Sequence, residues 1–288
     1  MIAFTGAGLS TSAGVPDYRS GTNTVLPTGP GGWERQAQKD YSKPKLRVDT
    51  LNAIPTKSHM ALVKLAEEGI LKFLISQNTD GLHKRSGFPS HKIAELHGNS
   101  NLEKCWNQKC KREFFRDFHT CEGFFKDHHT SRKCESCGDV LHDSIINFGE
   151  NLPQKELNDG FNNGKKADLV LCLGSSLKVT PAAQMPLEAV KNGGKMVIVN
   201  LQRTPLDEKG LRINALIDDV MVKLMEKLKM EIPRFSLRKR LTITKQKEEK
   251  KGEGEKVEVR GVDDEGRPFT LFREVTLEFL ESGEKYSQ

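Results

Sequence analysis

The sequence contains no apolar run that approaches the roughly 20 residues needed to cross a bilayer, so no membrane partner is expected. Its first residues also lack the basic segment followed by an apolar segment that is typical of a secretion signal. Six cysteines in a chain without such a signal favour metal ligands or free thiols over disulfides. A strong charge of one sign is absent too: the net charge of +6 permits an acidic partner but does not require one.

The apolar residues that are present form short strand and helix patterns. With 288 residues, 36% hydrophobic and 29% charged, the chain can fold into one large or two modest soluble domains. Continuous apolar runs predict buried parallel strands at 73–78, 170–174 and 195–200. Helical patterns lie at 58–69, 181–192 and 218–228. In the last of these, Val220, Leu224 and Leu228 form one apolar stripe. The alternation of strands and helices predicts an α/β fold with a doubly wound parallel sheet.

A glycine-rich turn follows the first apolar residues. Gly6, Ala7 and Gly8 match the start of a phosphate-binding turn, in which backbone N–H groups and a helix N-terminus face the phosphate. Thr11 occupies the place of the usual third glycine, so an ordinary tight turn remains the alternative. Only four residues precede Thr5, which predicts either a marginal first strand or a chain that is incomplete at its N-terminus.

The segment after this turn is unusual for a simple loop. Asp17, Tyr18 and Arg19 place an acid, an aromatic ring and a guanidinium beside the expected phosphate site, which indicates a loop that closes over a ligand. Residues 20–50 are rich in glycine, proline and polar side chains and are expected to form a long mobile loop covering the site.

Four cysteines have the spacing of a metal site. Cys105 and Cys110 form one pair, and Cys134 and Cys137 form the second. Thiolates at these spacings suit tetrahedral zinc, and four sulfur ligands leave no open position for catalysis, so the zinc is expected to be structural. Cys121 lies between the pairs and could replace Cys110.

The other cysteine and several histidines have simpler interpretations. Cys172 lies inside an apolar strand and is expected to be a core residue. His119, His128 and His129 lie near the cysteine pairs in polar surroundings and are expected to be solvated loop residues.

Polar segments occur where the carboxyl ends of parallel strands place ligands, at 6–8, 77–83, 95–99 and 174–179. Within them, His97 precedes a glycine that gives close access, and an imidazole suits proton abstraction from a hydroxyl at neutral pH. His83 has the same chemistry available, but it could instead cap a helix or pack in the core.

The chain changes character after Pro233. Residues 245–256 are a charge run with the composition of a linker. Residues 256–260 and 270–279 alternate as strands do, on either side of a turn at 263–266, and predict a hairpin that residues 240–244 could join.

Seven ordered motifs within residues 1 to about 233 give the chain a family resemblance. They are GAGLSTSAGVPDYRS, QNTDGLH, ELHGN, the two cysteine pairs, INFGENLP, LGSSLKVTP and VNLQ. Together they resemble the sirtuins, the NAD-dependent protein deacylases. The PDYR form, LCLGSSLKV and the IVNLQ segment most resemble the class IV branch, that of sirtuins six and seven. Of these two, RSG-x-P and LCLGSSLKV are more similar to sirtuin seven.

The resemblance implies a domain plan, two cofactors and a set of site residues. Residues 1–98 and 142–235 would form the Rossmann-like NAD-binding catalytic domain, 99–141 an inserted zinc-binding module, and 236–288 a charged linker with a β-hairpin-like C-terminal extension. NAD would contact Gly6, Ala7, Gly8, Thr11, Asp17, Tyr18, Arg19, Trp33, Gln77, Asn78, Asp80, His97, Gly174, Ser175, Ser176, Asn200, Gln202 and Val220. Catalysis would rest on His97 and Asn78, and Ile146 and Phe148 would line an apolar tunnel for the acyl-lysine. Asn200 could bond the ribose hydroxyls, which explains why no acidic residue follows the glycine turn by about 20 positions.

By this resemblance the protein is expected to remove acyl groups from lysines of histones or other nuclear proteins, releasing nicotinamide and O-acetyl-ADP-ribose. A mono-ADP-ribosyltransferase using the same site is one alternative. Another is a non-catalytic chromatin-binding module whose basic segments, such as 238–240, contact chromatin or nucleic acid. The resemblance also implies a nuclear location.

Overall fold

The computed structural model describes residues 1–40, 47–121, 127–247, 255–270, 276–278 and 285–287, and the chain divides into two compact units. Unit 1 comprises Met1–Ser100 and Ile145–Leu237, and unit 2 comprises Asn101–Ser144 and Arg238–Gln288. Among the described residues, no helix is long and apolar enough to span a membrane.

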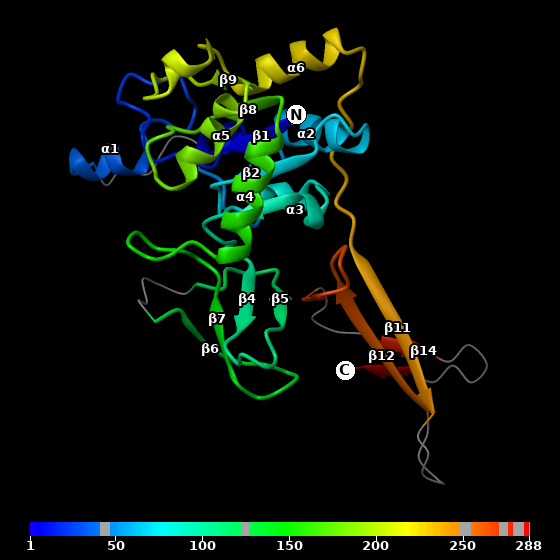
Figure 1. Ribbon diagram of the computed structural model, residues 1–288. Coiled ribbons are helices and arrows are strands. Elements are labelled where there is room, and N and C mark those ends of the chain that lie inside the picture. Colours follow the sequence, from blue (N-terminus) through cyan, green and yellow to red (C-terminus); the bar gives the residue numbers. More distant parts are fainter. Residues whose placement is uncertain (41–46, 122–126, 248–254, 271–275, 279–284, 288) are drawn as a thin grey trace. The chain divides into compact units, whose positions relative to one another are not determined.

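Unit 1 is built on a six-stranded parallel sheet with the strand order β10-β9-β8-β1-β2-β3 (Figure 1). Its strands are β1 (Ile2–Thr5), β2 (Phe73–Ser76), β3 (Ile93–Glu95), β8 (Leu169–Leu173), β9 (Lys195–Val199) and β10 (Leu211–Ile213). The chain builds outward from β1 to β3, returns to the other side of β1 at β8, and builds outward again. The order therefore reverses between β1 and β8, which is where open α/β sheets form a ligand crevice at the carboxyl ends of their strands.

Side-chain alternation along the strands divides the core of unit 1 into two apolar clusters. In β1, Ala3 belongs to one cluster, whereas Ile2 and Phe4 belong to the other. The first cluster includes side chains of α2 (Lys57–Glu67) and α6 (Ile217–Lys227), and the second includes side chains of α4 (Gln154–Lys166) and α5 (Met185–Lys191). Helices thus cover both sheet faces, and the predicted doubly wound α/β fold is confirmed. The shorter helices are α1 (Gly32–Ala37) and α3 (Leu82–Arg85).

β1 is short but lies at the centre of the sheet. Each of its four residues pairs with β2 on one side and with β8 on the other, and all four side chains are buried. The strand is therefore not marginal, because backbone pairing on both sides makes up for its length.

The predicted apolar stripe of α6 is displaced by one position. Met221 and Met225 are the fully buried residues of this helix, whereas Val220 and Leu224 are only partly buried against the core. Leu228, the third residue of the predicted stripe, caps the end of the helix and is 39% exposed.

Two buried histidines lie beneath the crevice in unit 1. The ring centroids of His59 and His83 are 4.8 Å apart, and His83 Nε2 lies 2.9 Å from Thr5 Oγ1. Thr56 N–H donates to His59 Nδ1 at 3.2 Å within the capping box of α2. Of the two uses considered for His83, packing is therefore the one observed. Burial lowers the pKa of His59 to about 3, and burial together with nearby His59 lowers the pKa of His83 well below 6.5.

We expect acid to destabilise unit 1 through these two histidines. Both titrate near pH 6.5 in the unfolded chain but stay neutral in the fold until far lower pH, so the unfolded state binds more protons. Their contribution is complete above about pH 6.5 and is lost as the pH falls, by up to about 1.4 kcal/mol per pH unit for each histidine. Urea unfolding from about pH 7 to 5 should show a shallower decline for His59→Gln/His83→Gln than for wild type. Exposed His91→Gln is the matched control, and an unchanged slope in the double variant would contradict the prediction.

Unit 2 contains a seven-stranded sheet with the order β11-β12-β13-β5-β4-β7-β6 and a separate two-stranded sheet. The long sheet consists of β4 (Leu102–Cys105), β5 (Glu113–Phe115), β6 (His129–Lys133), β7 (Val140–Asp143), β11 (Arg240–Lys247), β12 (Glu255–Val262) and β13 (Pro268–Phe269). β14 (Thr276–Glu278) pairs with β15 (Lys285–Ser287). Strands of the cysteine segment and of the C-terminal extension thus share one sheet, where the sequence predicted two separate parts.

The extension pairs differently from the prediction. β12 does form a hairpin around the turn at 263–266, but its partner is β13 at 268–269, whereas the predicted segment 270–279 contributes β14 to the other sheet. β11 joins β12 along eight residues, as suggested for 240–244. Both ends of the expected linker at 245–256 belong to strands because the β11–β12 ladder extends into them. Its middle, together with 271–275, 279 and part of the 20–50 loop (41–46), lies outside the described residues.

Candidate functional site

The glycine turn after β1 packs backbone to backbone against the turn after β8. Gly6 N–H donates to Leu173 O and Gly8 N–H donates to Gly174 O, both at 3.0 Å. A Cβ atom on Gly6 would lie 2.7 Å from Gly174 O, and one on Gly8 would lie 2.9 Å from Gly174 Cα. Both glycines are therefore required by this contact, whatever ligand the turn binds.

The helix that follows this turn is a 3₁₀-helix, Ala7–Ala13, and Thr11 has a role in it. Thr11 Oγ1–H donates to Gly8 O at 3.0 Å. Thr11, which replaces the usual third glycine, is thus hydrogen-bonded to the glycine turn. The close packing that a third glycine would give to a longer helix is absent here.

Polar side chains after β2 are buried against the same turn. Asn78 Nδ2–H donates to Gly6 O at 3.1 Å, and Asp80 accepts hydrogen bonds from Ser10 Oγ at 2.6 Å and Leu82 N at 2.9 Å. Burial raises the pKa of Asp80, and its hydrogen bonds and Arg85 oppose that shift. Asn78 Oδ1 is buried without a hydrogen-bond partner in the described part of the chain. An orphaned buried acceptor of this kind fits a ligand that supplies a hydroxyl or amide donor.

His97 follows β3 and has one ring nitrogen fixed. Its Nδ1 lies 2.9 Å from Gln77 O, and because a carbonyl oxygen can only accept, Nδ1 carries the proton. The lone pair is therefore on Nε2. Burial lowers the pKa of His97, so the ring is neutral at neutral pH. A half-buried imidazole with a free Nε2 lone pair can act as a general base.

Further hydrogen bonds connect the remaining strand ends to these residues. Ser175 Oγ–H donates to Gln77 Oε1 at 2.6 Å, and Asn200 Nδ2–H donates to Ser175 O at 2.7 Å. Gln202 Nε2–H reaches Arg19 O at 2.9 Å. The turns after β2, β8 and β9 are thus linked to each other and to the segment at 17–19.

Residues 17–33 form a loop that is held by its own hydrogen bonds and carries aromatic rings in contact with one another. Asp17 Oδ1 accepts from Arg19 N at 3.2 Å and Ser20 N at 3.0 Å, so this carboxylate is engaged within the loop. Trp33, in α1, has its ring centroid 5.3 Å from that of Tyr18 and 5.6 Å from that of Phe148, and the Arg19 guanidinium lies 4.3 Å from the Trp33 ring.

Most of the predicted ligand residues lie at the carboxyl ends of the parallel strands. Ala7 and Ser176 belong to the turns after β1 and β8, respectively. Ile146 N–H donates to His97 O at 3.1 Å, whereas Phe148 is 77% exposed. Val220 differs from the rest: it lies on α6, partly buried against the core.

The sequence did not indicate two residues that support the turn. Ser10 holds Asp80, and Asp218 on α6 accepts from Ser12 Oγ at 2.8 Å and from Ser58 N at 3.0 Å. Small polar residues in the GAGLSTS segment were the only available signal, and they do not specify a distant partner.

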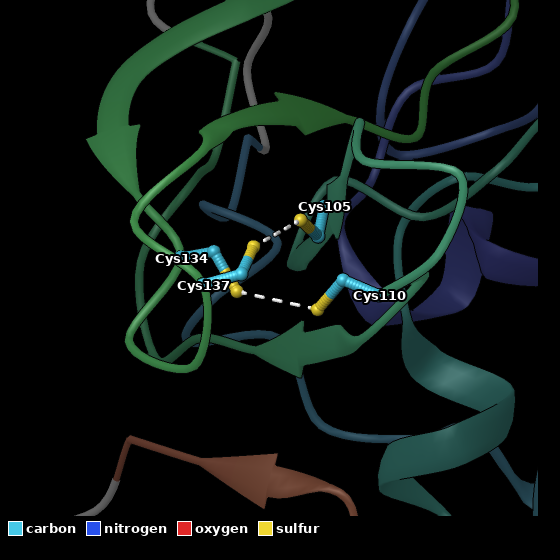
Figure 2. A group of neighbouring side chains, drawn as sticks. All are labelled: Cys105, Cys110, Cys134 and Cys137. Atoms are coloured by element: carbon cyan, nitrogen blue, oxygen red, sulfur yellow. Dashed lines mark hydrogen bonds between the residues drawn. The ribbon is translucent and has the colours of Figure 1, made fainter.

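Four cysteines of unit 2 form a compact sulfur cluster (Figure 2). The Sγ atoms of Cys105 and Cys137 are 3.4 Å apart, those of Cys110 and Cys134 are 3.7 Å apart, and all four lie within 4.8 Å of one another. Zinc–sulfur bonds of about 2.3 Å in a tetrahedron place sulfurs about 3.8 Å apart, so the cluster fits a closed structural zinc site. Cys121 is not part of the cluster, which settles that alternative in favour of Cys110.

The histidines near this cluster differ partly from expectation. His128 is not a solvated loop residue, because its Nδ1 lies 3.0 Å from Asp143 Oδ1 and Asp143 is buried. His129 lies in β6, with its ring centroid 4.3 Å from that of His142. Cys172 is fully buried in β8, as predicted.

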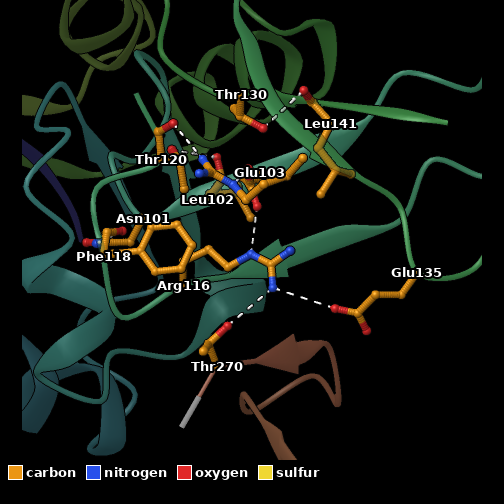
Figure 3. A network of polar contacts seen from close by, with 11 residues as sticks. Asn101, Leu102, Glu103, Arg116, Phe118, Thr120, Thr130, Glu135, Leu141 and Thr270 are labelled. Atoms are coloured by element: carbon orange, nitrogen blue, oxygen red, sulfur yellow. Dashed lines mark hydrogen bonds and ion pairs between the residues drawn. The ribbon is translucent and has the colours of Figure 1, made fainter. Parts of the chain in front are cut away.

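Unit 2 also contains a buried ion network centred on Glu103 (Figure 3). Glu103 is completely buried and binds Arg116 Nε at 2.6 Å and Arg132 Nε at 2.5 Å. Arg132 also donates to Thr120 O at 2.9 Å. No sequence pattern indicated this network, because Glu103, Arg116 and Arg132 have the pattern of ordinary surface charges.

Comparisons with known proteins agree with this geometry. The model of the Sir2 family matches residues 6–181. The chain is 48% identical to "NAD-dependent protein deacetylase SRT1" of Arabidopsis thaliana, over 82% of this chain and 48% of that protein. It is 39% identical to sirtuin-7 of Bos taurus (82% of this chain, 58% of that protein) and 37% identical to Sirt6 of Drosophila melanogaster (82% and 73%). The chain therefore spans about half the length of SRT1.

Solved structures show the same fold. "Sir2-p53 peptide-NAD+" matches with a TM-score of 0.59 and 31% identity, over 79% of this chain and 92% of that one. "Structure of Sir2Tm bound to a propionylated peptide" matches with a TM-score of 0.58 and 32% identity, over 80% and 93%. The sequence identities to sirtuin-7 and Sirt6 differ too little to assign the chain to one of them. SRT1 is more similar in sequence to the chain than either.

Proposed function

The chain belongs to the Sir2 family, and from that premise we propose that it is an NAD-dependent protein-lysine deacylase. The observation that carries the proposal is the His97 imidazole in unit 1, with Nδ1–H held by Gln77 O and the Nε2 lone pair available. Orphaned Asn78 Oδ1 and the close-packed glycine turn fit a dinucleotide at the strand-order reversal.

When bound, NAD supplies an anomeric carbon that an acyl oxygen can attack as nicotinamide leaves. His97 Nε2 would take a proton from a ribose hydroxyl, and Gln77 O would stabilise the resulting imidazolium through its bond to Nδ1–H. Asn78 Oδ1 would accept a hydrogen bond from the same end of the ligand. The four cysteines would hold zinc as a structural ion, because four sulfur ligands leave no open position for catalysis.

The other contacts have supporting roles. The phosphates and sugars would be bound by the glycine turn together with Asp80, Ser175, Asn200 and Gln202. The 17–33 loop would cover them with Tyr18, Arg19 and Trp33. Ile146 and Phe148 would line the site of the acyl-lysine, which agrees with the contact between the Phe148 and Trp33 rings.

We further propose that the substrates are histones or other nuclear proteins and that the protein acts in the nucleus, within the class IV branch. The net charge of +6 and the basic segment at 238–240 support contact with acidic chromatin.

Product analysis tests the reaction. Mass spectrometry of a panel of acylated histone peptides incubated with NAD should show deacylated peptide, nicotinamide and the matching O-acyl-ADP-ribose in equal amounts, which is O-acetyl-ADP-ribose for an acetylated peptide. Label from NAD that ends on protein would indicate ADP-ribosyl transfer instead. Salt-sensitive nucleosome binding without NAD turnover would indicate a binding module.

Substituting Gly6 by alanine is expected to weaken NAD binding by about 5–150-fold. The new Cβ would meet Gly174 O and Ser175 Cα, each at 2.7 Å, so the two turns must move apart, at a cost of about 1–3 kcal/mol. Isothermal titration of NAD into the variant measures the loss. Gly21→Ala is the matched control, because its Cβ would meet nothing within 4 Å. Wild-type affinity in Gly6→Ala would contradict a role of this turn in NAD binding.

A further inference from the structure

The C-terminal extension of unit 2 is bonded directly to β5, the strand that follows Cys110. Phe269 of β13 pairs with Phe115 of β5, and the backbone N–H of Thr270 donates to Phe115 O at 3.0 Å. The two phenylalanine rings stack with an interplanar angle of 15° and centroids 6.4 Å apart. The extension is thus part of the same sheet as the cysteine segment and is not an independent tail.

Arg267 is the main polar anchor of this seam. Its Nη1 lies 2.9 Å from Glu113 Oε2, and its guanidinium lies 4.9 Å from the Phe115 ring. Asp263, in the turn before it, binds Arg267 Nε at 2.7 Å and orients the side chain. Glu113 lies three positions after Cys110, so the anchor is close in sequence to a sulfur of the cluster.

A second arginine connects the extension with the other cysteine pair. Arg116, held by buried Glu103, donates from Nη1 to Thr270 Oγ1 at 3.2 Å (Figure 3). The same nitrogen lies 3.8 Å from Glu135, between Cys134 and Cys137. One guanidinium therefore contacts both the extension and the turn that carries two of the sulfurs.

A cavity of about 650 Å³ borders the seam. The cysteine segment lines it with Cys110, Lys111, Arg112 and Glu113, and the extension with Thr242, Arg260, Val262, Gly266, Arg267 and Pro268. The space beside Cys110 thus has the extension as its opposite wall. Any loosening of β13 from β5 would widen access to this sulfur.

We propose that residues 255–270 act as a retention clamp for the metal of the cysteine cluster. By fixing β5 and the turn at 134–137, the docked extension keeps the four sulfurs in place and restricts access to Cys110. Groups around a metal site that orient its ligands typically change metal affinity by about 10–100-fold when they are removed. Because coupling is reciprocal, metal binding must favour docking of the extension by the same factor.

Zinc release from the whole 288-residue chain tests the clamp. The zinc-loaded chain is mixed with excess 4-(2-pyridylazo)resorcinol, and formation of the coloured zinc complex gives the release rate. Arg267→Ala should release zinc about tenfold faster than wild type. Arg260→Ala should release it at the wild-type rate, because Arg260 lines the same cavity but is bonded to Glu258 on its own strand. This control separates loss of docking from a change of charge in the cavity.

Three further measurements make the outcome decisive. Zinc content before mixing and far-ultraviolet circular dichroism establish that the variants are folded and loaded. Hydrogen exchange of residues 255–270 should rise in Arg267→Ala, and it should rise in wild type when zinc is removed. Faster exchange in Arg267→Ala with an unchanged zinc release rate would overturn the proposal, as would equal acceleration by Arg267→Ala and Arg260→Ala.

Discussion

Replacement of His97 by alanine is expected to lower NAD-dependent deacylation of an acetylated peptide by about 10²–10⁴-fold, the usual contribution of a general base. The structure gives the reason: Gln77 O fixes the proton on Nδ1, so Nε2 is the nitrogen able to accept a proton. Zinc content and the unfolding temperature should change little, because within the described part of the chain this half-buried ring makes a single hydrogen bond, the contact with Gln77 O.

The pH dependence of kcat/KM in the wild type adds an independent check. A general base works only when unprotonated, so activity should be present above the His97 pKa and fall as the pH drops through it. Burial lowers this pKa, which places the fall below about pH 6.5. His91→Ala, an exposed histidine in the same unit, is the matched control and should keep wild-type turnover. Substantial turnover by His97→Ala would remove this imidazole from the mechanism.

Much of unit 1 could be predicted because its signals are local. The strands at 73–76, 169–173 and 195–199 are continuous apolar runs that end in polar residues, and this pattern specifies both a buried strand and a ligand-facing end. Ser175 and Gln77 follow two such strands, and Ser175 Oγ–H donates to Gln77 Oε1, so these strand ends meet at one edge of the sheet as the pattern predicts. The spacing of the cysteines was equally informative, because tetrahedral coordination restricts which pairs can meet.

What could not be predicted depends on contacts between residues that are distant in sequence. The glycine turn was interpreted as a ligand cradle, but nothing local shows that Gly6 and Gly8 face Gly174. Phe115 and Phe269 pair although they are more than 150 positions apart, so the periodicity within either segment cannot indicate this contact. The assigned strand partner of β12 was wrong for the same reason.

Buried charge was the other feature without a local signal. A glutamate in a short strand normally indicates a solvent-facing position. Glu103 is buried instead because two arginines neutralise its charge: Arg116, which follows β5, and Arg132, which lies in β6. This arrangement also makes the sulfur cluster and the extension depend on one carboxylate, since Arg116 contacts both Glu135 and Thr270.

Glu103→Ala is therefore expected to destabilise unit 2 by about 3–5 kcal/mol, because it leaves two arginines without their buried counter-charge. The chain has two tryptophans, Trp33 in unit 1 and Trp106 in unit 2. Fluorine NMR of 5-fluorotryptophan-labelled protein during urea unfolding can therefore follow each unit separately. The Trp106 signal should show a lower urea midpoint in the variant, while the Trp33 signal should move much less.

The control separates burial from ion pairing itself. Glu135→Ala removes a carboxylate that also pairs with Arg116 but is 63% exposed, and it should cost no more than about 1 kcal/mol. Replacing Glu103 and both arginines by apolar residues should cost less than Glu103→Ala alone, because no unpaired charge then remains buried. If Glu103→Ala and Glu135→Ala shift the Trp106 midpoint equally, the network does not hold unit 2 together, and the clamp would have to act through Arg267 alone.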